Sequence, residues 1–233
     1  MLILAFETSA KSCSAALHDG QKLLAESYQN SGLTHSQTLM VMAQDLLKVC
    51  GKSASDVTHL AVAAGPGSFT GVRIGVSAAK GFAWGAELPV YGVSTLQAMA
   101  LGLGAWEGHI CCCMDARRNQ VYNAIFLAEN GKLTRITEDR AIALAELKAE
   151  LEHIDGPIYL VGDGAALAHQ SLDIPELLLP PEHRQHQRAS GVALAALEAL
   201  ARGESTDGAA LQPNYMRMSQ AERERMEKLQ IKN

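Results

Sequence analysis

This chain of 233 residues lacks the features by which several classes of protein are recognised. It has no excess of basic residues, because 20 Lys and Arg stand against 25 Asp and Glu, a formal net charge of −5 at pH 7. Binding to a nucleic-acid backbone relies on clustered Lys and Arg, so the chain is not expected to grip nucleic acid on its own. It has no uncharged run of about 18 residues free of Gly and Pro, so no transmembrane helix is expected. Residues 1–7 carry no basic segment and include Glu7, which indicates a first strand rather than a signal peptide.

Cysteine pairs at the spacing of a metal site or a disulfide framework are absent too. The five cysteines are Cys13, Cys50 and the run 111–113, an odd number with no Cys-x-x-Cys pair. This pattern fits neither a disulfide framework nor a zinc site, and it indicates a reduced, cytoplasmic protein. Hydrophobic residues make up 48% of the chain and charged residues 19%. That balance predicts a sizeable core and excludes global disorder.

The most informative segment is the glycine-rich stretch 65–75, Gly-Pro-Gly-Ser-Phe-Thr-Gly-Val-Arg-Ile-Gly. It follows an apolar run at 59–64, which is a predicted strand, and it opens a predicted helix. A P-loop is excluded because no Lys-Ser or Lys-Thr pair follows Gly71. A Rossmann fingerprint is excluded because Thr70 stands where its third glycine would be. Two alternatives remain, an anion-binding helix N-terminus or a tight turn with close packing.

The order of the predicted elements repeats along the chain. Three short strands are followed by alternating helices and strands, and the same pattern then starts again. The predicted strands are 2–8, 12–18, 22–28, 59–64, 89–93, 109–115, 120–127, 132–137 and 158–161, and the predicted helices are 35–50, 70–87, 95–103, 144–153 and 190–201. Residues 221–228 alternate in charge and are interpreted as a solvated helix face. Two rounds of this kind indicate duplicated α/β units.

The first strand of each round ends in an acidic residue and a polar turn, at 7–12 and at 115–120. This duplication resembles the actin/Hsp70/sugar-kinase (ribonuclease H-like) architecture, in which two such hairpins face each other across a nucleotide cleft. Two ordinary hairpins with exposed turns are the alternative. The predicted organisation is an N-terminal actin-like domain over 1–106, joined by the C-terminal segment 211–233, and a smaller second actin-like domain over 107–210.

Three segments carry a resemblance to a known family. They are residues 4–9 (Leu-Ala-Phe-Glu-Thr-Ser), residues 65–75, and residues 114–122 (Met-Asp-Ala-Arg-Arg-Asn-Gln-Val-Tyr). Together they resemble TsaB, also called YeaZ, the non-catalytic partner of TsaD in the transfer of a threonylcarbamoyl group to the N6 of adenosine in bacterial tRNA (t6A formation). The resemblance spans the whole chain. One departure is Glu7, which stands where the family usually has Asp and whose longer side chain argues against a nucleotide contact at that turn.

The resemblance implies a scaffold rather than an enzyme, with no catalytic and no metal-binding residue. The implied partners are TsaD, the catalytic subunit, and TsaE, an ATPase. It further implies a homodimer when the chain is alone, contact with tRNA only through the complex, and no membrane association. No cofactor is required, and weakly bound or interface-bound ATP or ADP is left open. The residues of the implied degenerate nucleotide cleft are Glu7, Thr8, Ser9, Asp115 and Arg117.

The side chains that an independent enzyme would need are missing. In the catalytic relative TsaD a metal is held by a His-x-x-x-His pair on a helix, whereas here His35 is followed four residues later by Leu39. His183 and His186 follow two prolines in a polar segment and are interpreted as solvated. Ser68 lacks the second glycine of a Gly-x-Ser-x-Gly elbow. A stand-alone nucleotide-dependent enzyme of the same fold and a glycoprotease-like peptidase are therefore the weaker alternatives.

The predicted helix 35–50 has two apolar faces. One stripe, assigned to the core, consists of Leu39, Met42, Leu46 and Val49. A second stripe, predicted to face a partner, consists of Met40, Ala43 and Leu47. The alternative is a helix buried on both sides. In the resembled family this helix and the helix after the glycine-rich segment pack against the equivalent pair of the partner, which implies an interface of His35, Ser36, Met40, Ala43, Leu47, Phe69, Val72 and Arg73.

Overall fold

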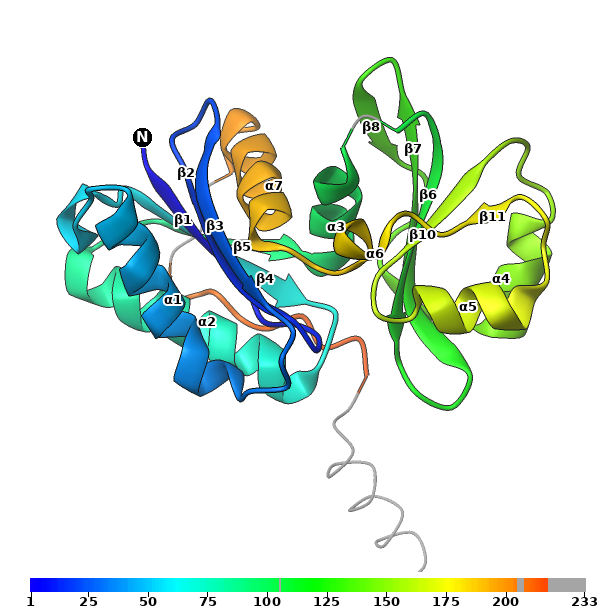
Figure 1. Cartoon of the computed structure of the whole chain (residues 1–233), viewed down its shortest axis with the longest axis horizontal. Helices are drawn as coiled ribbons and strands as arrows, with labels where there is room; N and C mark the ends of the chain where they lie inside the picture. The colour runs from blue at the N-terminus through cyan, green and yellow to red at the C-terminus, as the bar shows by residue number, and fades with distance from the viewer. Residues whose placement is uncertain (105, 205–207, 218–233) are drawn as a thin grey trace, which may run out of the picture.

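The computed structural model of the chain describes residues 1–104, 106–204 and 208–217. Two mixed β-sheets lie beside each other, and helices pack on the faces of each sheet (Figure 1). No helix in these described ranges is long and apolar enough to cross a membrane.

The first sheet has the strand order β3-β2-β1-β4-β5. Its central strand β1 (Ile3–Glu7) pairs with the antiparallel strand β2 (Cys13–His18), which in turn pairs with β3 (Leu23–Gln29). On the other side β1 pairs with the parallel strand β4 (His59–Gly65), followed by β5 (Val90–Ser94). Every residue of β1 and β2 is buried, which requires packed cover on both faces of the sheet.

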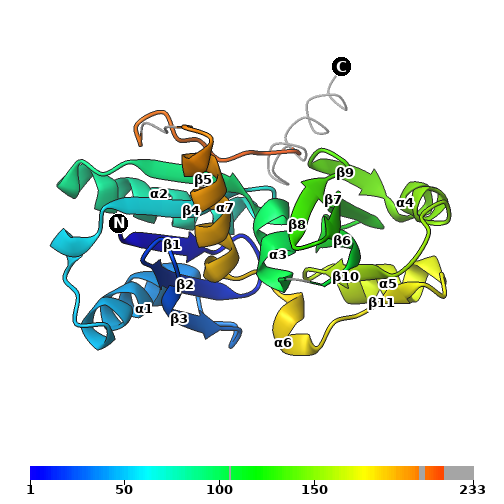
Figure 2. The same ribbon diagram turned by 90° about the horizontal axis from the view of Figure 1, so that it is seen from above.

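Helices supply that cover. The helical elements of this half are α1 (His35–Val49), η1 (Ala54–Asp56), α2 (Phe69–Ala86), α3 (Thr95–Leu103) and α7 (Ala189–Ala201). Side chains alternate along a strand, so Leu4 and Phe6 pack toward α1 and α2, whereas Ile3 and Ala5 pack toward α7. Figure 2 shows α7 crossing the first sheet on the face opposite α1 and α2. The first sheet therefore lies between two helical layers.

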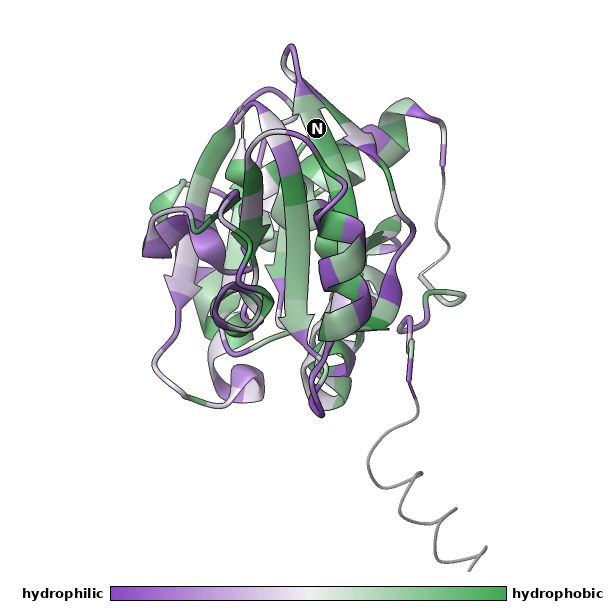
Figure 3. Cartoon of the chain, turned by 90° about the vertical axis from the view of Figure 1, so that its right-hand side faces the viewer, coloured by the Kyte–Doolittle hydropathy of each residue, from purple (hydrophilic) through white to green (hydrophobic). Residues whose placement is uncertain are grey.

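The second sheet has the strand order β11-β10-β6-β7-β8, and β9 also pairs with β7. Its elements are β6 (Gly108–Asp115), β7 (Gln120–Glu129), β8 (Lys132–Arg135), β9 (Arg140–Ala143), α4 (Leu144–Leu151), β10 (Ile158–Val161), α5 (Ala165–Leu172), β11 (Leu177–Leu178) and α6 (Glu182–Gln185). The alternation of β6 places Cys111 and Cys113 toward α4 and α5, and Cys112 toward α3. The strands at the centre of this half are hydrophobic (Figure 3). The cysteine run is therefore core, as small apolar side chains.

The two sheets repeat one topology. Strands β1 and β6 are each central, each followed by antiparallel strands on one side and flanked by parallel strands on the other. The predicted duplication of α/β units is confirmed. The short strands β9 and β11 were not predicted, because four or two residues carry too little alternation to distinguish a strand from an irregular segment.

The position of α7 corrects the predicted domain organisation. The range 107–210 placed this helix in the second domain, but its alanine-rich face packs on β1, β2, β4 and β5 of the first sheet. The chain returns to the first sheet at the first residue of the helix, where the backbone N–H of Ala189 donates to the Ser14 hydroxyl at 2.8 Å. Periodicity indicates that a helix has an apolar face, but not which sheet will bury it. Residues 218–233, including the predicted solvated helix at 221–228, lie outside the described residues.

Candidate functional site

The glycine-rich segment packs directly on the polar turn that follows β1. A Cβ atom at Gly67 would lie 2.5 Å from the carbonyl oxygen of Ser9, and one at Gly71 would lie 2.1 Å from that of Thr8. The backbone N–H of Ser68 donates to the Ser9 carbonyl oxygen at 2.7 Å, and the Ser68 hydroxyl accepts from the N–H of Gly71 at 3.3 Å as the N-cap of α2. The requirement for glycine here follows from close packing, the second of the two alternatives drawn from the sequence.

A cavity of about 380 Å³ lies between the two sheets. The turns after β1 and β6 meet there, together with the start of α2 and residues 214–217. Of the predicted cleft residues, Ser9, Asp115 and Arg117 line this cavity. Glu7 and Thr8 are both fully buried and do not line it. The structure therefore brings the two polar turns together, but only three of the five residues line the space between them, and the Ser9 hydroxyl is itself buried.

Glu7 is committed to its own turn. Its Oε1 accepts the backbone N–H of Ser9 at 2.6 Å, while its Oε2 is buried without a hydrogen-bond partner among the described residues. Burial raises the pKa of Glu7 from 4.5 to about 7, with a smaller upward contribution from the charge of Asp163. Burial also raises the pKa of Asp163, which accepts a hydrogen bond from the Gln187 amide at 3.2 Å. Two carboxyl groups with raised pKa values thus lie at and beneath the base of the cleft.

The buried position of Glu7 predicts a dependence of stability on pH. Because its folded-state pKa is raised, the folded protein binds this proton more tightly than the unfolded chain does. The stabilisation is fully present below about pH 4.5 and is lost as the pH rises to about 7, with a total loss of about 3 kcal/mol. The measurement is urea unfolding of the wild type and of Glu7→Gln between pH 5 and pH 8.

In that series the advantage of Glu7→Gln over the wild type should grow from pH 5 to about pH 7 and then level off, because the substituted amide side chain cannot titrate. Glu146→Gln, which changes an exposed glutamate of α4, is the control and should follow the wild-type curve. Parallel curves for the wild type and Glu7→Gln would contradict the assignment of this pKa to the buried carboxyl group.

The turn after β6 is held by Asp115. Its carboxylate accepts the backbone N–H of Arg117 at 2.7 Å and pairs with the Arg117 guanidinium at 3.2 Å. Arg117, Arg118 and Asn119 have φ values of +65°, +56° and +56°, a left-handed backbone conformation that residues other than glycine rarely adopt. The Asp115 carboxylate is therefore used to hold a strained turn, while the Arg117 side chain is 81% exposed at the rim of the cleft.

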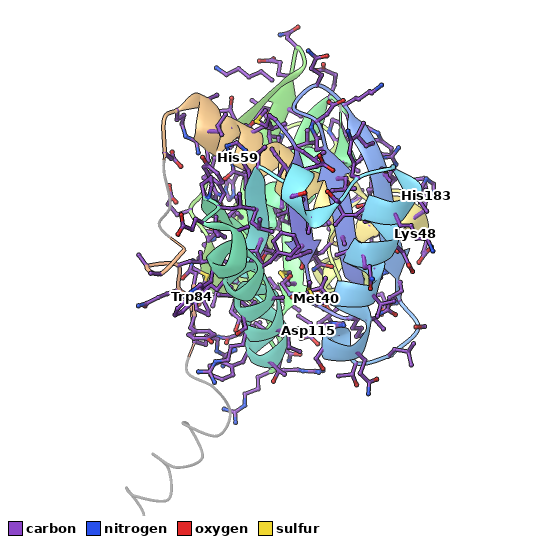
Figure 4. All side chains as sticks on the ribbon, turned by 90° about the vertical axis from the view of Figure 1, so that its left-hand side faces the viewer. Met40, Lys48, His59, Trp84, Asp115 and His183 are labelled. Carbon is purple, nitrogen blue, oxygen red and sulfur yellow. The ribbon has the colours of Figure 1, made fainter. Side chains whose placement is uncertain are left out.

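A second hollow, a groove of about 470 Å³, lies on the outer surface between α1 and α2. Its lining includes Ser36, Met40, Phe69 and Arg73, four of the residues predicted for the partner interface. Figure 4 looks onto these two helices and labels Met40 in the groove region and Trp84 on α2. Met40 is 42% exposed and Trp84 is 87% exposed. Large apolar side chains are thus accessible on this pair of helices.

The other predicted interface residues are placed differently. Ala43, Leu47 and Val72 are buried in the core of the first half, so the prediction that they face a partner is wrong. The buried face of α1 is broad: it includes every residue of the two predicted stripes except Met40 and Val49. Val49, assigned to the core, is exposed at the last residue of the helix.

His35 is half-buried at the start of α1. Its Nε2 lies 2.8 Å from the carbonyl oxygen of Ala10, so the ring contacts the turn after β1. Four residues later Leu39 is buried in the core. In the described ranges no three side chains of His, Cys, Asp or Glu come together in a way that could hold a metal ion. The Nε2 of His186 lies 3.7 Å from the Glu182 carboxylate, and His183 is exposed.

Tyr215 is a site residue that the sequence did not reveal. Its ring stacks on Phe69 with the ring centroids 4.5 Å apart, and its hydroxyl accepts the Nε–H of Arg73 at 2.6 Å. The Arg73 guanidinium also lies 3.9 Å from the centroid of Phe69. We call these three residues the aromatic clamp. No local pattern could have joined a tyrosine to an arginine that precedes it by 142 positions.

Several known proteins are similar to this chain. Residues 26–225 match the family model described as "TsaD: tRNA N6-adenosine threonylcarbamoyltransferase". The chain is 32% identical over 225 residues to the tRNA threonylcarbamoyladenosine biosynthesis protein TsaB of Bacillus subtilis, covering 95% of this chain and 96% of that protein. It is 38% identical over 169 residues to the TsaB of Escherichia coli, covering 70% of this chain and 72% of that protein.

Solved structures give the same relationship. YeaZ from Pseudomonas aeruginosa matches with a TM-score of 0.76 at 26% identity, covering 92% of this chain and 99% of that one. Together with the duplicated sheet topology, this likeness confirms the predicted α/β architecture of the actin/Hsp70/sugar-kinase type.

Proposed function

The chain belongs to the TsaB (YeaZ) family, and from this premise we propose that it is the scaffold and activating subunit of the complex that forms t6A in tRNA. Its relatives are named for tRNA threonylcarbamoyladenosine biosynthesis. The observation that supports a scaffolding role most directly is the open groove between α1 and α2, with exposed Met40 at its wall. Exposed Met is typical of adaptable interaction surfaces.

A non-catalytic role is the second part of the proposal. The acidic residue at the start of each polar turn holds that turn: Glu7 accepts the backbone N–H of Ser9, and Asp115 accepts that of Arg117. Leu39 occupies the position where the second histidine of a metal-binding pair would be needed. Ser68 uses its hydroxyl as a helix cap. These assignments favour a subunit over a peptidase or an independent nucleotide-dependent enzyme.

The proposed partner is TsaD, docked on the α1–α2 groove. A partner that covers the groove removes the side chains of Met40 and Phe69 from water, and it orients the catalytic subunit by favouring the arrangement that fits this surface. In the absence of TsaD a second copy of the chain takes its place as a homodimer. TsaE joins the assembly, and tRNA is contacted only through the complex. A cytoplasmic location is part of the same proposal.

No cofactor is needed for this role. ATP or ADP would bind only weakly in the cleft, because its lining is mixed in charge: Asp115 and Asp163 lie there together with Lys11, Arg117 and Arg217, so the basic side chains have acidic neighbours that compete with phosphate groups. A nucleotide held at the partner interface is compatible with the exposed Arg73 in the groove. Equilibrium dialysis of ATP against the chain alone and against its complex with TsaD distinguishes the two sites.

The test of the proposed function is threonylcarbamoyl transfer to tRNA by purified TsaD and the remaining pathway proteins, with and without this chain. Transfer should require both TsaD and this chain, and the chain alone should show none. Transfer that proceeds equally well without the chain would remove the scaffolding role. ATP turnover or proteolysis by the isolated chain would instead support one of the two enzyme alternatives.

A further inference from the structure

Residues 208–217, the C-terminal strap, run along the first half of the molecule toward the cleft. The Lys80 ammonium donates to the carbonyl oxygen of Leu211 at 3.0 Å, and the Leu211 side chain is buried in the first core. Further along, the backbone N–H of Asn214 donates to the carbonyl oxygen of Ala64 at the end of β4, at 2.6 Å. The strap is thus attached both to α2, a helix of the proposed partner surface, and to β4 of the first sheet.

The aromatic clamp lies between the groove and the cleft. Phe69 lines both hollows, Arg73 lines the groove, and Tyr215 lines the cleft. The hydrogen bond from Arg73 to Tyr215 and the stacking of Tyr215 on Phe69 therefore join the outer surface of α2 to the strap. Both Arg73 and Tyr215 are exposed, so water competes for these contacts while the groove is open.

Two residues beyond the clamp, the strap reaches the other half of the molecule. Nη1 of Arg217 donates to the carbonyl oxygen of Ala116 at 2.7 Å. Ala116 lies between Asp115 and Arg117 in the strained turn after β6, and its own N–H donates to the carbonyl oxygen of Gln120. A continuous series of contacts therefore runs from the groove through the clamp and the strap to the opposite wall of the cleft.

We propose that the aromatic clamp and the strap couple the partner groove to the cleft. A partner with an apolar helical face, seated on α1 and α2, excludes water from Arg73 and Phe69, the two members of the clamp that line the groove, and so strengthens the hydrogen bond from Arg73 to Tyr215 and the cation–π contact of Arg73 with Phe69. The strap is then fixed on the first half, and Arg217 fixes the turn after β6. Partner docking thereby rigidifies the mouth of the cleft. The identity of the partner rests on the proposed function, whereas the coupling rests on the contacts within this chain.

The coupling is reciprocal. If partner docking stabilises the ordered form of the turn after β6 by a given factor, then any contact in the cleft that stabilises the ordered turn must raise the affinity for the partner by the same factor. A partner that instead offered a carboxylate to Arg73 would draw the guanidinium away from Tyr215 and loosen the strap. The two cases give opposite changes in the backbone dynamics of the turn, which makes the direction of the effect measurable.

The experiment is amide hydrogen exchange of residues 116–120, measured on the full chain at monomeric dilution and with saturating TsaD. TsaD should slow exchange in this turn several-fold in the wild type. In Arg217→Met, which keeps an unbranched apolar stem but lacks the donor, TsaD should still dock and the turn should no longer be slowed. Tyr215→Phe, which keeps the ring and loses the hydroxyl, should reduce the effect. Gln212→Ala, an exposed position of the strap, is the matched control and should behave as the wild type.

The affinity of the variants supplies an independent readout. Because coupling is reciprocal, loss of the Arg217 contact should raise the Kd for TsaD about fivefold, although Arg217 is not in the groove. Unfolding midpoints check that each variant is folded. Slowing of the turn that persists in Arg217→Met, or faster exchange on docking, would overturn the coupling.

Failure of the proposed function has a different signature. If TsaD does not bind the wild type at all, the proposed partner is wrong, and the same exchange experiment is carried out across dimerisation of the chain. Slowing of the turn on dimerisation, lost in Arg217→Met, would support the coupling with a second copy as the partner. No change in the turn with either partner would overturn it.

Discussion

Replacing Met40 by aspartate is expected to abolish binding to TsaD while leaving the protein folded. Met40 is 42% exposed and lines the groove between α1 and α2, so its replacement disturbs little of the core. In the complex the new carboxylate would be buried in an apolar contact without a partner, at a cost of about 3 kcal/mol or more. That corresponds to a Kd raised more than about 100-fold, measured by titration calorimetry, with a matching loss of threonylcarbamoyl transfer.

Val41→Asp is the matched control. Val41 is the next residue of α1 and is 55% exposed, but it does not line the groove. The same charge introduced there should leave the Kd for TsaD near the wild-type value, and both variants should unfold within about 0.5 kcal/mol of the wild type. Wild-type binding by Met40→Asp would show that the groove is not the interface. Loss of binding in Val41→Asp alone would place the interface on the other side of α1.

Replacing Gly71 by alanine is expected to destabilise the protein by about 3 kcal/mol, even though alanine is the better helix former. Gly71 lies in the first turn of α2, where an added Cβ atom would meet the carbonyl oxygen of Thr8 at 2.1 Å. That oxygen belongs to the backbone of the buried turn after β1 and has no flexible end that could move aside, so α2 must shift. Urea unfolding measures the loss of stability.

Gly81→Ala in the same helix separates packing from helix propensity. A Cβ atom at Gly81 would have no neighbour within 4 Å, so only the propensity changes, and stability should rise by up to about 1 kcal/mol. A shift of α2 in Gly71→Ala also displaces Phe69 and Arg73, so TsaD binding should weaken in that variant and not in Gly81→Ala. Equal stabilities of the two variants would contradict the close contact between Gly71 and Thr8.

The candidate site was predictable from the sequence only where the signal was local. The polar turns that begin at Glu7 and at Asp115 follow predicted strands, and the structure places both turns beside one cavity. That Glu7 itself is buried beneath the cavity could not be deduced, because alternation along β1 does not tell which of its residues the other half will cover. The two stripes of α1 were separated by periodicity alone, and the sheet buried most of both.

By itself the sequence determined the order and type of the longer elements, the duplication, and the family. Hydrophobic periodicity, turn residues and short motifs act over a few positions, so these features are readable without a structure. Only the tertiary structure decided that α7 returns to the first sheet, that Met40 remains exposed while Ala43 does not, and that Tyr215 stacks on Phe69. These features depend on contacts between residues far apart in the chain. Such contacts form when the two sheets and their helices pack together, and local sequence patterns do not encode them.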